Sequence, residues 1–145
     1  MERVGLVEFS SQVNNVIPLA ELGRNRADLM GAVDGLEAGG DTALLDALNA
    51  AYVRLQQLND HERINAIVAM TDGRENNSRI SLRELARKMQ DGNESGVPVV
   101  VFCIAYGDDA DYDILEALAE ATDGQVRKGD LESIRQLYKI LSTYF

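Results

Sequence analysis

Several residue types that mark stapled or membrane-embedded proteins are scarce in this chain. Among its 145 residues there is one cysteine, Cys103, so an internal disulfide is excluded and the redox compartment stays unassigned. Cys103 lies within the apolar run VVVFCIAY, where we expect it to be a small buried side chain. No apolar run approaches the roughly 20 residues of a membrane helix, and no basic-then-apolar leader follows Met1. We therefore expect no membrane insertion and assign no localisation.

Positive charge is also in short supply. The chain has 14 lysines and arginines against 24 aspartates and glutamates, a net charge of −10. Such a field repels phosphate backbones, so we predict that nucleic acid is not a partner. The charge suits cations or basic protein surfaces, although solubility alone is the simpler explanation. Hydrophobic residues make up 46% of the chain, which predicts a single folded domain over residues 1–145.

The order of apolar patterns predicts the fold class. After an initial pair of strands, helical and strand patterns alternate, which is typical of an α/β fold with an open, mostly parallel sheet and helices on both faces. Ligands bind such sheets outside the carboxyl ends of the strands. The expected strands are 3–10, 13–19, 64–70, 97–107 and 125–129, and the expected helices are 25–36, capped by Asn25, 42–58, 81–92, 111–124 and 130–145.

Asp72 follows the expected strand 64–70 within the sequence TDG. A carboxylate at a strand end is held on a rigid element and faces the crevice, where oxygen ligands bind Mg²⁺ or Mn²⁺. The alternative is an Asx turn, in which Asp72 bonds to its own backbone. Thr42, in GGDTAL, offers a similar choice, since its hydroxyl suits either the cap of the next helix or a metal ligand.

Other polar residues give weaker signals. His61 is the only histidine, and we expect it to be solvated, because a general base needs an orienting partner. Ser10 and Ser11 lack the sequence context of a nucleophile. The acidic segment 108–113 fails the spacing of an EF-hand loop, so we interpret it as a turn followed by acids in the first turn of a helix.

Five stretches carry a resemblance to a known family. They occur in the family's order over positions 3 to 145, and the most specific feature is GGDTALLDAL followed about thirty residues later by TDG. On these stretches the chain resembles the von Willebrand factor type A domain, especially its bacterial members. The stretches are RVGLVEFSS, GGDTALLDAL, VAMTDGREN, VVVFCIAYGDDAD and LAEATDGQVRKGDLESIRQLYKILSTYF.

The resemblance implies a metal-ion-dependent adhesion site. Thr42 and Asp72 match the threonine and aspartate ligands of two of its three loops. The third loop, Asp-x-Ser-x-Ser, is absent, and the chain opens at the segment that matches the family's second strand. We therefore expect an N-terminally truncated domain, whether by cloning, a mis-called start or natural loss. Because Mg²⁺ requires about six oxygens, we predict weak or no binding of Mg²⁺ or Mn²⁺.

The resemblance favours a protein-interaction or adhesion module rather than an enzyme. A partner would dock at the strand ends and complete the metal shell with an acidic side chain. One alternative is a metal-dependent hydrolase of α/β fold, although TDGRE lacks a second aspartate beside Asp72. Another is a fragment of a larger surface protein without autonomous function. Without the family's first strand, we expect strands 3–9 and 64–70 either to pair directly or to leave edges that form a homodimer.

Overall fold

The computed structural model describes residues 2–37 and 39–130 and, beyond these, residues 132, 133, 135, 136, 139 and 143. The helix expected over 130–145 therefore falls largely outside the described residues. The elements are β1 (Arg3–Phe9), β2 (Val13–Glu21), α1 (Leu22–Asp34), α2 (Leu44–Leu58), β3 (Asn65–Thr71), α3 (Leu82–Ser95), β4 (Val99–Ala105), α4 (Tyr112–Ala121) and β5 (Gln125–Lys128).

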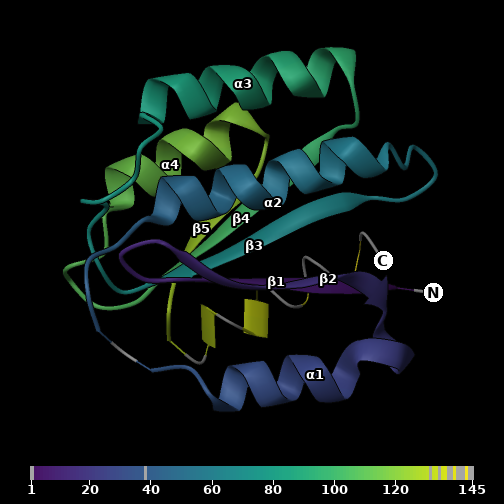
Figure 1. Ribbon diagram of the computed structural model, residues 1–145. Coiled ribbons are helices and arrows are strands. Elements are labelled where there is room, and N and C mark those ends of the chain that lie inside the picture. Colours follow the sequence, from purple (N-terminus) through teal and green to yellow (C-terminus); the bar gives the residue numbers. More distant parts are fainter. Residues whose placement is uncertain are drawn as a thin grey trace.

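The strands form two hydrogen-bonded groups. β3, β4 and β5 make a parallel sheet in that order, and β1 pairs with β2 as an antiparallel hairpin. Helices α2, α3 and α4 lie on one side of the strands, and α1 lies on the other side beneath the hairpin (Figure 1). The predicted α/β class, with a parallel sheet and helices on both faces, is confirmed. The expected direct pairing of strands 3–9 and 64–70 is wrong for the described residues, since β1 and β3 belong to separate sheets.

Helix boundaries follow from local chemistry. The Ser81 hydroxyl accepts the backbone N–H of Glu84, and the Glu84 carboxylate accepts the N–H of Ser81, so α3 begins with the predicted capping box. The prediction that Asn25 caps the first helix is wrong. That helix begins at Leu22, and Asn25 is buried within it, where its Nδ2 donates to the Val4 carbonyl at 2.7 Å. The asparagine therefore fastens α1 to the hairpin.

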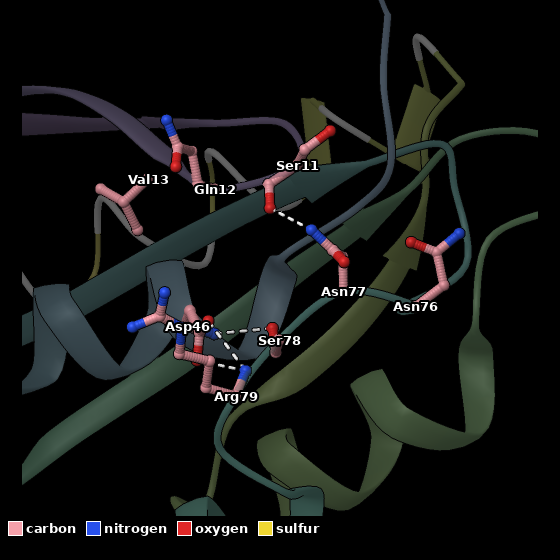
Figure 2. A pocket seen from close by; sticks show the side chains of 8 residues that line it. All are labelled: Ser11, Gln12, Val13, Asp46, Asn76, Asn77, Ser78 and Arg79. Carbon is pink, nitrogen blue, oxygen red and sulfur yellow. Dashed lines mark hydrogen bonds between the residues drawn. The ribbon is translucent and has the colours of Figure 1, made fainter.

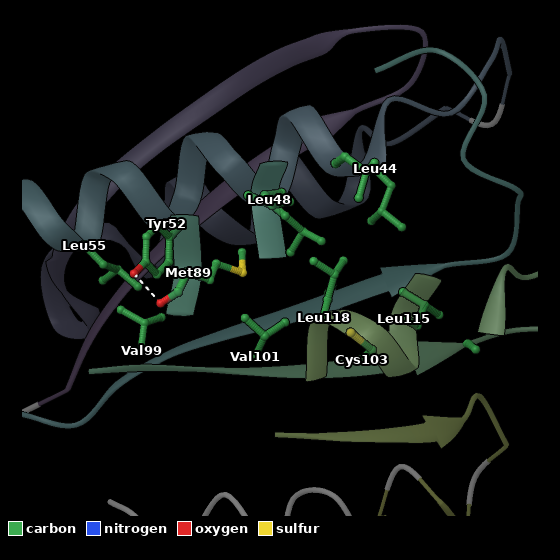
Figure 3. Close-up of a cluster of buried hydrophobic side chains, with 14 of the residues drawn as sticks. Leu44, Leu48, Tyr52, Leu55, Met89, Val99, Val101, Cys103, Leu115 and Leu118 are labelled. Carbon is green, nitrogen blue, oxygen red and sulfur yellow. Dashed lines mark hydrogen bonds between the residues drawn. The ribbon is translucent and has the colours of Figure 1, made fainter. Parts of the chain in front are cut away.

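The core lies between the parallel sheet and helices α2, α3 and α4 (Figure 3). Side chains from alternate residues of β4 meet Leu48 of α2, Met89 of α3 and Leu118 of α4. Cys103 is fully buried among them, as expected, and burial raises the pKa of its thiol to about 12. It is therefore an uncharged packing residue. None of the described helices is long and apolar enough to cross a membrane.

Candidate functional site at the carboxyl edge of the sheets

Thr42 and Asp72 come together where β3 ends. Asp72 is exposed and follows Thr71, the last residue of β3. A methyl group placed on Gly73 would lie 2.8 Å from the Thr42 hydroxyl oxygen. Glycine at position 73 thus allows the threonine side chain to lie against the turn that carries Asp72. The two candidate residues therefore occupy neighbouring places at one edge of the sheet.

The structural alternatives for these two side chains do not hold. The backbone N–H of Gly73 bonds at 3.3 Å to the hydroxyl of Thr71, and within the described ranges the Asp72 carboxylate accepts no hydrogen bond. Ala43 occupies the N-cap position of α2 and provides no side-chain cap. The hydroxyl of Thr42 and the carboxylate of Asp72 are thus not used in the local turn or the helix cap.

Backbone contacts fix Thr42 against the loop after β3. Its N–H donates to Asn76 Oδ1 at 2.8 Å, and its carbonyl accepts the N–H groups of Asn76 and Asn77 at 3.1 and 3.2 Å. The two segments are 34 residues apart in sequence. The position of the Thr42 side chain is therefore set by tertiary contacts on both sides of its peptide group.

Two carboxylates join the start of α2 to the loop after β3, one from each segment. Glu75 Oε2 accepts the backbone N–H of Leu45 at 2.9 Å and the hydroxyl of Ser78 at 2.9 Å. Asp46 accepts the N–H groups of Arg79 and Ile80 at 2.9 to 3.1 Å. Glu75 thus satisfies a free helix N–H at the positive end of the α2 dipole. Sequence reasoning gave no role to Glu75, because the helix to which it bonds, α2, lies thirty residues earlier in the chain.

The turn after β1 completes this edge. The Ser10 carbonyl accepts the N–H of Ala43 at 2.7 Å, and the Ser11 hydroxyl accepts the N–H of Asp41 at 2.9 Å. The Asn77 amide donates to the Ser11 carbonyl. Gly40 has φ +79° and packs so closely on Ser11 that an added Cβ would lie 2.6 Å from its hydroxyl oxygen. The serines and glycines therefore serve loop packing here.

A polar hollow of about 660 Å³ opens beside Thr42. It is lined by the turn between β1 and β2, by Asp46 in the first turn of α2, and by residues 76–79 (Figure 2). Thr42 and Asp72 do not line it, although Asn76 belongs to the hollow and bonds to Thr42. Sequence reasoning missed this hollow, since its three segments meet only in the tertiary structure.

The remaining acidic and basic candidates lie at two different edges of the sheet. Among the residues with described structure, no three histidine, cysteine, aspartate or glutamate side chains are grouped to hold a metal. His61 contacts Asn59 at 3.0 Å in the loop before β3, at the opposite edge of the sheet. Segment 108–113 follows β4 at the same edge as Asp72, since Thr71 pairs with Ala105. It leads into α4, with Asp113 in the first turn of that helix as expected.

Comparison with known proteins gives a family and a set of structural neighbours. The family model described as von Willebrand factor type A domain matches residues 2–140. No match is found among the curated proteins. A von Willebrand factor type A protein from Catenulispora acidiphila superposes with a TM-score of 0.72 at 22% identity, over 96% of this chain and 32% of that one. The present chain thus spans about a third of that relative.

Two further solved structures share the fold. BatB from Bacteroides thetaiotaomicron superposes with a TM-score of 0.73 at 14% identity, over 98% of this chain and 78% of that one. Proximal thread matrix protein 1 from the mussel byssus, described with a zinc-occupied MIDAS motif, gives 0.53 at 25% identity, over 82% of this chain and 28% of that one. The family model covers nearly the whole sequence and the neighbours have the same fold, so this chain belongs to the von Willebrand factor type A domain family.

Proposed function

We propose that this chain is a protein-interaction module that docks partners at the carboxyl edge of its sheets, with Thr42 and Asp72 as ligands of a divalent cation. The observation that carries the proposal is the contact of the Thr42 hydroxyl with Gly73, beside an Asp72 carboxylate without a hydrogen-bond partner in the described structure. Type A domains are generally interaction modules, and one structural neighbour is described with zinc at this kind of site.

The donor set suits a hard cation and limits its affinity. A hydroxyl and a carboxylate provide oxygen ligands of the kind that Mg²⁺ and Mn²⁺ prefer. Two fixed ligands are far fewer than the six or so that Mg²⁺ takes, so waters and an acidic side chain of the partner would complete the shell. We therefore expect weak binding in the absence of a partner, with a dissociation constant on the order of 0.1–1 mM or weaker.

Paramagnetic broadening by Mn²⁺ tests the site directly. In NMR spectra of the chain, we expect Mn²⁺ to broaden the amide signals of Thr42 and Gly73 first, and Asp72→Asn to abolish this selectivity. Asp109→Asn, which removes an acid from the loop after β4, is the matched control and should leave it intact. Broadening centred elsewhere would contradict the proposed ligands. Tight, stoichiometric Mg²⁺ uptake by calorimetry would contradict the ligand count.

A peptide with carboxylate side chains tests the docking role. We expect a fluorescein-labelled octapeptide of alternating glutamate and glycine to bind more tightly with Mn²⁺ than with EDTA, by at least about fivefold, because the peptide supplies the missing charged ligand. The Mn²⁺ effect should vanish in Asp72→Asn and persist in Asp109→Asn. An equal Mn²⁺ effect in the two variants would overturn the proposal.

The open strand edges favour a second copy of the chain as a partner. In the described part of the fold, β1 and β3 each pair with a strand on one side only, and Val68 and Met70 of β3 are 45% and 51% exposed. Such edges template pairing with another chain. We expect light scattering to give a dimer mass that Val68→Lys reduces to the monomer mass. A monodisperse wild-type monomer would contradict this expectation.

A further inference from the structure

The hollow beside Thr42 has a chemistry of its own. Its volume of about 660 Å³ falls within the roughly 300–1,000 Å³ range of small-ligand sites. Arg79 lines it, and in the described structure the guanidinium makes no ion pair or hydrogen bond. This free cation stands out in a chain with a net charge of −10. The unused charge and the concave wall make the hollow the strongest candidate for a second contact site.

The free groups around Arg79 are mainly hydrogen-bond donors. Asn76 uses its Oδ1 to accept the Thr42 N–H, which leaves its NH₂ group available. The Ser11 hydroxyl accepts the N–H of Asp41 and keeps its own proton to donate. The exposed Gln12 amide adds two further donors at the rim (Figure 2). A donor-rich wall with a guanidinium is suited to a carboxylate.

The one carboxylate in the hollow is already engaged. Both oxygens of Asp46 accept backbone N–H groups, from Arg79 at 2.9 and 3.1 Å and from Ile80 at 3.1 Å. These contacts stabilise the carboxylate, and they hold the backbone of Arg79 in place without using its side chain. The guanidinium is therefore presented on a fixed backbone, and in the described structure it makes no ion pair with Asp46.

We propose that the hollow lined by Arg79, Gln12 and Asn76 binds an acidic side chain of a protein partner, as an anchor that needs no metal. This inference rests on the proposed docking function, and it adds a second contact next to the Thr42 and Asp72 site. A partner that reaches Thr42 passes the hollow, because Asn76 belongs to both. A partner with two neighbouring acids would then engage one at each site.

The anchor is tested in EDTA, which removes any divalent cation from the Thr42 and Asp72 site. We expect the glutamate–glycine octapeptide to bind more tightly than its lysine–glycine counterpart, against the sense of the overall charge. Arg79→Gln should weaken glutamate-peptide binding about tenfold, since it removes a charge-assisted contact. The control is Arg83→Gln. Arg83 is also an exposed arginine, but it lies on α3 outside the hollow, so its loss should change binding by less than about twofold.

A conservative variant separates the shape of the arginine from its charge. Arg79→Lys keeps the charge and loses the bidentate fork, so we expect an intermediate loss. None of these variants alters the backbone groups that bond to Asp46, and circular dichroism confirms that each is folded. Three results would overturn the anchor: tighter binding of the lysine peptide, no binding of the glutamate peptide, or equal losses of glutamate-peptide affinity in Arg79→Gln and Arg83→Gln. If Mn²⁺ did not strengthen peptide binding in the wild type, while Arg79→Gln still weakened it in EDTA, only the cation site would be overturned.

Discussion

The parallel sheet and the hairpin differ both in how apolar their strands are and in how deeply those strands are buried. In β4, VVVFCIA, every residue but Val100 is buried, whereas in β1, RVGLVEF, every residue keeps some exposure. In the described structure, β4 has a strand on each side and α2, α3 and α4 against one of its faces, while β1 has β2 on one side only. The more apolar strand is also the one with neighbours on both sides, so we expect β4 to contribute more to stability than β1.

A matched pair of valine substitutions tests whether the buried sheet contributes more to stability than the hairpin. Val101 in β4 is fully buried and Val16 in β2 is 53% exposed. We expect Val101→Ala to lower the free energy of unfolding by about 2–3 kcal/mol, from lost burial and a cavity. Val16→Ala should change it by less than about 0.5 kcal/mol. Urea unfolding of both variants measures the two effects, and equal losses would show that the hairpin is as well packed as the sheet.

The thiol in β4 makes the sheet sensitive to high pH. The folded pKa of Cys103, about 12, lies above its ordinary value of 9.0 because of burial. Above pH 9 the unfolded chain loses this proton first, so the stabilisation present below pH 9 falls progressively as the pH rises towards 12. At pH 10 we expect a loss of about 1.4 kcal/mol relative to pH 7.

Cys103→Ala is the control for this pH effect. It should be less stable than the wild type at pH 7, because it leaves a small cavity, and the difference between the two proteins should narrow from pH 9 to pH 11. Urea unfolding at each pH gives both curves. Parallel curves would show that other groups cause any loss of stability at high pH.

The attachment of the hairpin to α1 should have the smallest effect. The Asn25 amide donates to the Val4 carbonyl at 2.7 Å, while its buried Oδ1 has no partner in the described structure. We expect Asn25→Ala to cost about 1 kcal/mol, the usual net value of one hydrogen bond, and to speed hydrogen exchange in β1 without changing β4. Equal acceleration in both strands would show that hairpin and sheet unfold as one unit.

Much of the fold could be predicted from short-range patterns. The capping box at Ser81, the apolar run around Cys103 and the alternation of helices and strands predicted α3, β4 and the α/β class. The prediction that Asn25 caps a helix is wrong, because the sequence context of a helix cap is the same as that of an asparagine inside a helix that bonds to a neighbouring strand. The helix boundary at Leu22 depended on how β2 ends.

The candidate site was predictable only in part. Thr42 and Asp72 were found from their sequence context and the family resemblance, and their role as metal ligands stays a prediction. Glu75 and Arg79 were missed. Both residues are placed by hydrogen bonds to the first turn of α2, and no local pattern around position 75 or 79 points to a segment thirty residues earlier.

By itself, the sequence determined which segments become helices and strands and which strand is buried, because hydrophobic periodicity and capping act between near neighbours in the chain. Only the tertiary structure decided three features of the described residues: β1 and β3 belong to separate sheets, Thr42 lies against Gly73, and Arg79 lines a hollow without forming an ion pair. These features arise where distant segments meet, and the free energy of each such contact depends on the geometry that all the others impose.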